Sequence, residues 1–306
     1  MNHLQKTLEQ YFDYCQFQKR LDDKTLKAYR IDLKQFSLWT STDSIEAINS
    51  DDLESYITHL HQTYKPKTVK RKIASLKAFF HYLEYKDYID INPFNKLQIK
   101  FREPVILPKT IPLHTIEALL ASMYQKYDTI SNSNRKKILL RDITVIELLF
   151  STGIRISELC SLHTEDVNLY DGVILIHGKG AKERRLQIGN SSVLAILREY
   201  HSAFFHEISA SGYLFVNRQN ERLSEQSVRH LINKHAAAAN IDMHITPHMF
   251  RHSFATCLLE ADVNIRYIQE MLGHSSINIT EIYTHVAVAK QRDILMTKHP
   301  RKDFNF

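Results

Sequence analysis

Four prolines interrupt the middle of this 306-residue chain within about twenty residues, a stretch that has little apolar periodicity. They are Pro93, Pro104, Pro108 and Pro112. Proline has no backbone N–H donor and restrains the residue before it to extended conformations, so regular elements end at such a stretch. The pattern predicts a linker over 93–112, between an N-terminal domain, 1–92, and a C-terminal domain, 113–306. A chain of this length is long enough for two ordinary domains.

The N-terminal part has the apolar spacing of helices. Apolar side chains at intervals of three and four lie on one face of a helix. The two clearest runs are Leu26, Tyr29, Leu33, Phe36 and Val69, Ile73, Leu76, Phe80, Leu83. Asn49-Ser50-Asp51-Asp52 is typical of a helix start. We expect four or five helices over 2–88, packed as a small bundle.

The C-terminal part is mixed. Residues 173–177 are all apolar up to a final histidine, 178–182 are rich in glycine and lysine, and 185–188 alternate again, which predicts a β-hairpin. The polar tract 124–137 predicts a surface loop. Helices are expected over 143–150, ending at Gly153, and over 224–239, 246–260, 264–272 and 277–286. The fold class is therefore mainly α with a small β-hairpin or sheet (α+β).

Charge and cysteine content narrow the class of protein. The net charge of +6 and pI of about 9.0 allow an anionic partner. Lys and Arg number 17 against 14 Asp and Glu up to Val105, and 23 against 20 after it, so both parts share the basic excess. Three widely spaced cysteines without a CxxC pair indicate neither a disulfide framework nor a structural zinc site. No apolar run approaches ~20 residues, so we expect a cytoplasmic protein with no membrane partner.

The last sixty residues contain the side chains best suited to chemistry. Thr246-Pro247 is a helix start that places His248 in the first turn, where backbone N–H groups favour an anion such as phosphate. Arg251 shares that face of the helix. His274 follows a glycine, and Tyr283 lies nine residues further on. A tyrosine, an arginine and two histidines without a metal suggest phosphoryl transfer through a tyrosine nucleophile.

Each of these residues also has a plainer interpretation. His248 would support a helix start, His274 would cap a helix, and Tyr283 would belong to the core. Arg251 would make a surface ion pair, and Arg155 would make another with Glu158. Exposed ion pairs contribute little to stability. Lys179 would be a solvated turn residue. What favours chemistry is the order and spacing of the whole set.

The set resembles the tyrosine recombinases, the phage-integrase and Xer-type family. The similarity covers nearly the whole chain and is most specific in its C-terminal part. Its motifs are Ser-Thr-Gly-Ile-Arg-Ile-Ser-Glu-Leu from Ser151, Gly-Lys-Gly-Ala-Lys-Glu-Arg from Gly178, Thr-Pro-His-Met-Phe-Arg-His-Ser-Phe-Ala-Thr from Thr246, Leu-Gly-His-Ser-Ser from Leu272 and Ile-Tyr-Thr-His-Val from Ile282. Weaker matches are Thr25-Leu26-Lys27-Ala28-Tyr29-Arg30 and Asn92-Pro93-Phe94. The tract 124–137 is longer than in a minimal Xer-type enzyme.

This resemblance implies a catalytic set and a reaction. The catalytic residues would be Arg155, Lys179, His248, Arg251, His274 and Tyr283. Tyr283 would attack a DNA phosphodiester and form a 3′-phosphotyrosyl bond, which conserves the bond's free energy without ATP. The arginines and His274 would stabilise the charge on the non-bridging oxygens, His248 would assist proton transfer, and Lys179 would protonate the leaving 5′ oxygen. Glu158 would hold Arg155 or its neighbours in place. No metal and no cofactor would be needed.

The resemblance also implies how DNA is bound. An N-terminal helical core-binding (SAM-like) domain and a mixed catalytic domain would form a C-shaped clamp on double-stranded DNA with a specific recombination site. The DNA-binding candidates are Thr25, Tyr29, Arg30, Lys67, Lys70, Arg71 and Lys77. Without the resemblance, the basic face over 65–77 is equally well explained as a solvated face. Family members act as tetramers, so a homo-tetramer, or pairing with a related recombinase, is expected, with residues 287–306 docking on a neighbouring protomer.

Two other functions remain as alternatives. A catalytically silent DNA-binding regulator would have the same fold, and a type IB topoisomerase shares the tyrosine chemistry. Within the recombinases, mobile-element integration or excision and chromosome-dimer resolution use the same residues.

Overall fold

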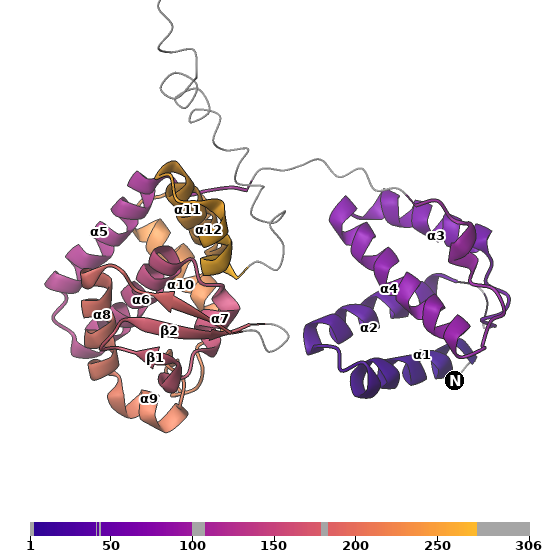
Figure 1. Cartoon of the computed structure of the whole chain (residues 1–306), viewed down its shortest axis with the longest axis horizontal. Helices are drawn as coiled ribbons and strands as arrows, with labels where there is room; N and C mark the ends of the chain where they lie inside the picture. The colour runs from indigo at the N-terminus through magenta and orange to yellow at the C-terminus, as the bar shows by residue number, and fades with distance from the viewer. Residues whose placement is uncertain (1–2, 41, 43, 100–107, 179–182, 274–306) are drawn as a thin grey trace, which may run out of the picture. The chain divides into compact units, whose positions relative to one another are not determined.

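The computed structural model describes residues 3–40, 42, 44–99, 108–178 and 183–273. The chain divides into two compact units, residues 1–105 and 106–306, each of which is described here by itself (Figure 1). Phe94 is buried in the core of the first unit and Ile111 in that of the second. The domain boundaries at 92 and 113 remain a prediction.

The N-terminal unit is a small helical bundle, as predicted (Figure 1). Its elements are α1 (His3–Asp13), a π-helical turn (Tyr14–Gln18), α2 (Asp23–Trp39), α3 (Ser50–Thr63), α4 (Pro66–Tyr85) and a 3-10 turn (Pro93–Lys96). The helix starts follow from the sequence. Asp22 accepts a hydrogen bond from the backbone N–H of Thr25, Asn49 and Asp52 form a capping box, and Pro66 occupies the first position of α4.

A buried carboxylate joins α2 to α4. Asp32 is 1% exposed and accepts hydrogen bonds from Lys72 Nζ at 3.1 Å, from Ser75 Oγ at 2.9 Å and from Arg71. Lys72 is itself buried, and its ammonium lies 4.7 Å from the centre of the Tyr64 ring. Two cations thus meet one carboxylate inside the bundle, where an unpaired charge is costly.

We expect the Asp32→Ala substitution to lower the free energy of unfolding by about 3–5 kcal/mol, because it leaves the Lys72 ammonium buried without its carboxylate. Urea unfolding, followed by circular dichroism, measures this change. The matched control is Asp23→Ala, an exposed aspartate in the first turn of the same helix. If the two variants unfold at the same urea concentration, the Asp32 ion pairs contribute nothing to stability.

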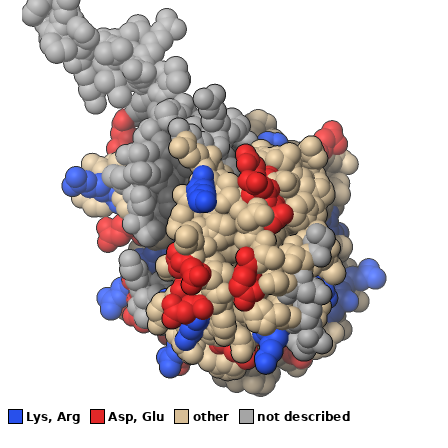
Figure 2. All heavy atoms as spheres, turned by 90° about the vertical axis from the view of Figure 1, so that its right-hand side faces the viewer, with Lys and Arg blue, Asp and Glu red and all other residues tan. Residues whose placement is uncertain are grey.

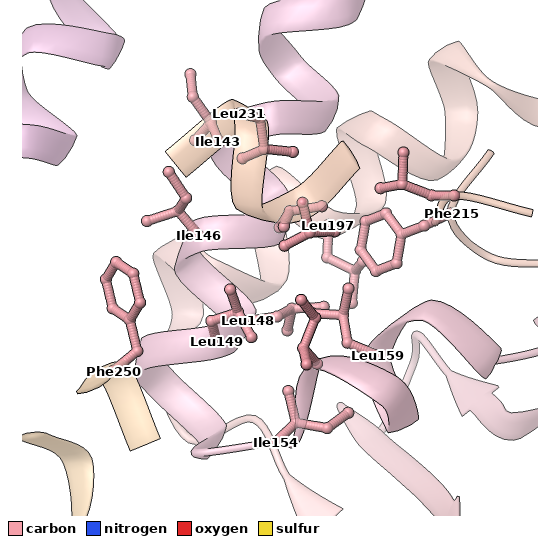
Figure 3. Packing of buried hydrophobic residues seen from close by; sticks show 14 of the residues in the cluster. Ile143, Ile146, Leu148, Leu149, Ile154, Leu159, Leu197, Phe215, Leu231 and Phe250 are labelled. Carbon is pink, nitrogen blue, oxygen red and sulfur yellow. The ribbon is translucent and has the colours of Figure 1, made fainter. Parts of the chain in front are cut away.

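The C-terminal unit surrounds a central helix, α6. Its elements are α5 (Leu113–Thr129), α6 (Ser133–Thr152), α7 (Ile156–Ser161), a 3-10 turn (Thr164–Asp166), β1 (Val167–Asn168), β2 (Val173–His177), β3 (Glu183–Gln187), α8 (Ser191–Ala203), α9 (Phe205–Ser211), α10 (Glu225–Ala238), α11 (Pro247–Glu260) and α12 (Ile265–Leu272). Ile146 and Leu149 of α6 lie in one buried cluster with Leu197 of α8, Leu231 of α10 and Phe250 of α11 (Figure 3). This core fixes the ends of α6 and α11 relative to each other.

The predicted hairpin is confirmed as strands β2 and β3 of a three-stranded antiparallel sheet in the order β1-β2-β3. The short third strand, β1, was not predicted. Ile176 pairs with Arg184 across the hairpin. Directly opposed residues of an antiparallel pair point to the same face, so Arg184 lies on the face of the sheet that carries buried Ile174 and Ile176.

The prediction of a surface loop over 124–137 is wrong. Helix α5 extends to Thr129 and α6 begins at Ser133. Asn132 caps α6 by accepting from the backbone N–H of Arg135, and the Tyr124 hydroxyl donates to Glu147 of α6 at 2.8 Å. The polar residues of the tract are therefore helix ends and caps. The predicted helix over 277–286 lies outside the described residues.

The fold class is confirmed as mainly α with a small sheet. None of the helices within the described ranges is long and apolar enough to cross a membrane.

Candidate active site

The ends of α6 and α12 are both glycines in the left-handed conformation. Gly153 ends α6 with φ of 60°, and Gly273 ends α12 with φ of 64°. A Cβ atom on Gly153 would lie 2.5 Å from Cδ1 of Phe254, and one on Gly273 would lie 2.9 Å from Cδ of Arg184. Both the backbone angle and the close neighbours therefore require glycine at these two positions.

Arg251 connects these two helix ends. The residue is 4% exposed, its Nη1 donates to the carbonyl of Gly153 at 2.7 Å, and its Nη2 donates to the carbonyl of Leu272 at 2.6 Å. Carbonyls at the C-terminal end of a helix carry partial negative charge, which stabilises the guanidinium. Arg251 is thus a buried structural centre, and the interpretation as a surface ion pair is wrong.

Arg155 reaches the same place from α7. Glu158 accepts from Nη1 of Arg155 at 2.8 Å and from its backbone N–H at 2.9 Å, while Nη2 donates to the carbonyl of Gly273 at 3.0 Å. Glu158 is 8% exposed, so this pair is not a surface pair either. The Arg155 side chain is about one-third exposed and so remains accessible to a ligand.

Arg184 is part of this arrangement, although sequence analysis did not select it. Its Nη1 and Nη2 donate to the two oxygens of Glu158 at 2.9 and 2.8 Å, and its Nε donates to the carbonyl of Met271 at 3.0 Å. The bidentate geometry is the one that a guanidinium prefers with a carboxylate. The signal in the sequence was the position of Arg184 two residues before Leu186 in a strand, which places both side chains on the same, buried face of the sheet.

The two arginines determine the charge of Glu158. Burial favours the protonated carboxyl, but the hydrogen bonds from Arg184 and from Arg155 outweigh it and hold the pKa of Glu158 at about 2. A depressed pKa means that the ionised carboxylate stabilises the fold above its unfolded-state pKa of about 4.3. This stability is lost as pH falls toward 2.

We therefore expect the unfolding free energies of the native protein and a Glu158→Gln variant to differ most at neutral pH. The ionisation contributes about 3 kcal/mol at pH 7, and about half of that remains at pH 3. Denaturant titrations of both proteins at each pH measure the difference, and carboxylates common to both proteins cancel. A difference that is the same at pH 7 and pH 3 would contradict the assignment.

His248 lies in the first turn of α11, as predicted, with Arg251 one turn further along. Partial loss of hydration and the positive charges of Arg251, Arg229 and Arg155 lower the pKa of His248, although the residue keeps an exposed surface. His252 is next to this group, and burial together with His248 and Arg251 lowers its pKa to about 4. His248 is therefore neutral at physiological pH and able to accept a proton.

The structure thus brings together four of the predicted site residues, Arg155, Glu158, His248 and Arg251. The other three, Lys179, His274 and Tyr283, lie outside the described residues. In sequence, however, His274 directly follows Gly273, and the carbonyl of Gly273 accepts a hydrogen bond from Arg155.

The predicted DNA-binding residues of the N-terminal unit have different surroundings. Lys67, Lys70 and Lys77 are exposed along one side of α4. Arg71 on the same side is paired with Asp32, although nearly half of its side chain remains exposed. Figure 2 shows a face on which acidic side chains lie at several places among uncharged ones, with a few basic side chains between and beside them.

The three candidates on α2 take part in packing. The Thr25 hydroxyl donates to Asp22 at the helix start, the Tyr29 ring stacks on Tyr11, and the Arg30 guanidinium lies 5.0 Å from the centre of the Phe12 ring. Arg30 is exposed beyond that contact.

Comparisons with known proteins show which family the chain resembles over both of its units. The model of the phage integrase family matches residues 117–290, and the model of the phage integrase N-terminal SAM-like domain matches residues 8–86. A tyrosine recombinase of Agathobacter rectalis is 63% identical over 306 residues, which cover 100% of both chains. Tyrosine recombinase XerD of Pseudomonas putida is 33% identical, over 96% of this chain and 97% of the other.

Solved structures show the same fold. The XerH site-specific recombinase bound to palindromic difH substrate, in a post-cleavage complex, has a TM-score of 0.73 at 22% identity, over 95% of this chain and 83% of the other. The crystal structure of XerA recombinase has a TM-score of 0.53 at 25% identity, over 97% of this chain and 99% of the other. Because a family model matches more than half of its length and a relative is 63% identical over all of it, the chain belongs to the phage integrase family of tyrosine recombinases, enzymes that cleave and rejoin DNA.

Proposed function

We propose that this recombinase cleaves one DNA strand at a specific site through a 3′-phosphotyrosyl bond to Tyr283. The observation that carries the proposal is the meeting of Arg155, Arg251 and a neutral His248 at the ends of α6 and α12. Fixed, permanently charged guanidinium groups beside a proton acceptor suit a phosphodiester as the substrate.

In the cleavage step, one bond to phosphorus forms as another breaks, and each proton has a donor and an acceptor. The Tyr283 oxygen forms a bond to phosphorus as the bond from phosphorus to the 5′ oxygen breaks. His248 takes the phenol proton, since the ordinary tyrosine pKa of ~10 makes spontaneous ionisation rare at neutral pH. Lys179 gives a proton to the leaving 5′ oxygen. A 5′-hydroxyl from another strand then reverses the step and rejoins the DNA.

Arg155 and Arg251 stabilise the negative charge that gathers on the non-bridging oxygens. A guanidinium has five N–H donors in a planar fork, so one that already binds a carbonyl still has donors to offer to a phosphate. His274 adds a further donor. Glu158 does not contact the phosphate on this proposal, but it holds Arg155 in place.

The N-terminal bundle binds the duplex through α4. Lys67, Lys70 and Lys77 lie on its exposed side, and lysines in such a row bind backbone phosphates without reading sequence. We infer that Arg71 contributes less, because its guanidinium is paired with Asp32. Four protomers, identical or paired with a related recombinase, would assemble on two sites, with residues 287–306 docking between them.

The test of the reaction is covalent trapping on a nicked DNA that carries the recombination site, in which cleavage releases a short strand that cannot religate. The proposal predicts a protein–DNA adduct that resists denaturation and maps to the peptide containing Tyr283. Tight site-specific binding with no adduct would favour a silent regulator. Relaxation of supercoiled DNA without any site requirement would favour a type IB topoisomerase.

The genes around the coding sequence would distinguish mobile-element integration from chromosome-dimer resolution. Neighbouring conjugation or phage genes would indicate an integrase that moves the element. An isolated housekeeping position would indicate chromosome-dimer resolution.

A further inference from the structure

Three arginines bind three consecutive carbonyls at the end of α12. Arg184 donates to Met271 at 3.0 Å, Arg251 to Leu272 at 2.6 Å and Arg155 to Gly273 at 3.0 Å. The arginines come from β3, α11 and the start of α7. The last carbonyls of a helix have no partner within the helix, and here side chains from three separate elements bind them.

Arg184 differs from the other two because it binds an α12 carbonyl and both oxygens of a buried carboxylate. Its Nη atoms bind both oxygens of Glu158, the carboxylate that also holds Arg155. The Arg184 side chain is only 12% exposed, and Gly273 lies so close that a Cβ atom there would meet it at 2.9 Å. A buried guanidinium with a fixed partner on each side has little freedom to move.

We propose that Arg184 is a positioning residue for strand cleavage, which acts by holding Glu158 and the end of α12 so that the Arg155 guanidinium is directed at the scissile phosphate. This inference rests on the proposed function. Glu158 binds the Arg155 guanidinium through Oε1 and the Arg155 backbone N–H through Oε2, and Arg184 donates to both of these oxygens. Loss of Arg184 therefore removes two of the four hydrogen bonds that fix the orientation of the carboxylate beside the Arg155 guanidinium. It also removes the hydrogen bond by which β3 holds the Met271 carbonyl at the end of α12.

The size of the effect follows from geometry. A displacement of a catalytic group by about 1 Å costs about a hundredfold in rate. We expect Arg184→Gln to slow adduct formation at saturating DNA by about tenfold to a hundredfold, with little change in the DNA concentration at half-saturation. Arg184→Lys keeps the charge but not the fork and should recover only part of the rate. The matched control is Arg185→Gln, the next residue along β3, which is exposed and should remain within about twofold of the native rate.

Two measurements separate positioning of Arg155 from other roles. In a double-mutant cycle, Glu158→Gln should add little to the defect of Arg184→Gln, because both substitutions loosen the same guanidinium. A DNA substrate with sulfur in place of the bridging 5′ oxygen releases a thiolate, which needs no protonation because the thiol pKa is much lower than that of an alcohol. The defect of Arg184→Gln should persist on this substrate, since the arginine clamp acts on the non-bridging oxygens.

Several results would overturn the inference. They are a native rate for Arg184→Gln, full recovery on the sulfur substrate, additive effects of the two substitutions, or a defect confined to DNA binding. Thermal unfolding followed by circular dichroism checks that each variant is folded at the assay temperature. If Arg184→Gln is not folded there, Arg184→Lys provides a second test. If the native protein and Arg185→Gln also form no adduct, the proposed function itself fails. If they do form it, only the role of Arg184 is in question.

Discussion

Changing Tyr283 to Phe is expected to abolish the covalent protein–DNA adduct, with a loss of at least about a thousandfold in its rate of formation. The substitution removes a single oxygen, the atom that we propose forms the bond to phosphorus. Loss of a nucleophile on which a reaction depends has effects of this size or larger. Quantifying the trapped adduct on denaturing gels over time, at saturating nicked DNA, measures the rate.

The matched control for this experiment is Tyr267→Phe. Tyr267 lies on α12 and is 62% exposed, so loss of its hydroxyl should leave both the adduct and the fold unchanged. DNA binding by Tyr283→Phe should also remain, because the arginines and lysines that are proposed to bind phosphates are all present. Adduct formation by Tyr283→Phe at the native rate would show that another residue is the nucleophile.

Local signals allowed much of the fold to be predicted from the sequence. The apolar stripes of α2 and α4, the glycine at the end of α6 and the Thr246-Pro247 start of α11 each depend on neighbours within a few residues. The hairpin was predictable for the same reason, since an apolar strand, a glycine-rich turn and renewed alternation occur within sixteen residues, 173–188. Such features do not need the rest of the molecule.

Contacts between distant segments could not be predicted in this way. Arg184 meets Glu158 and Met271, which lie 26 and 87 residues away in the sequence. Nothing near Asp32 indicates that Arg71 and Lys72 will enclose it. The tract 124–137 was mistaken for a loop because helix ends, caps and loops share the same polar residue types, and only the bond from Tyr124 to Glu147 distinguishes them.

The candidate site illustrates both cases. The spacing of His248 and Arg251 on one helix is local, and the sequence predicted that they share a face. The burial of Arg251 and its bonds to two helix ends are not local, so the sequence left a surface ion pair as the plainer interpretation. The family resemblance selected the candidate residues, and for Arg155 and Arg251 the structure shows which groups hold the side chains.

Arg251→Lys is expected to lower the rate of adduct formation by about a hundredfold to a thousandfold, although it conserves the charge. A lysine side chain has a single nitrogen, so it cannot reproduce the two bonds that the separate Nη atoms of Arg251 make to the carbonyls of Gly153 and Leu272 at 2.7 and 2.6 Å. The end of α12 is then held less firmly, and the phosphate no longer meets a planar guanidinium with two N–H donors. Loss of one fixed donor to a developing oxyanion costs about this much.

The design of this experiment separates catalysis from stability. Loss of one buried hydrogen bond should also lower the free energy of unfolding, by about 1–3 kcal/mol, so rates are compared at a temperature at which both proteins are fully folded. The control is Arg266→Lys, an exposed arginine at the start of α12 that has no part in the site. Because Arg251 is proposed to act on the transition state, the rate at saturating DNA should fall while the DNA concentration at half-saturation changes little. The opposite result, weaker binding with an unchanged rate at saturation, would mean that Arg251 serves to dock DNA and not to stabilise the phosphorane.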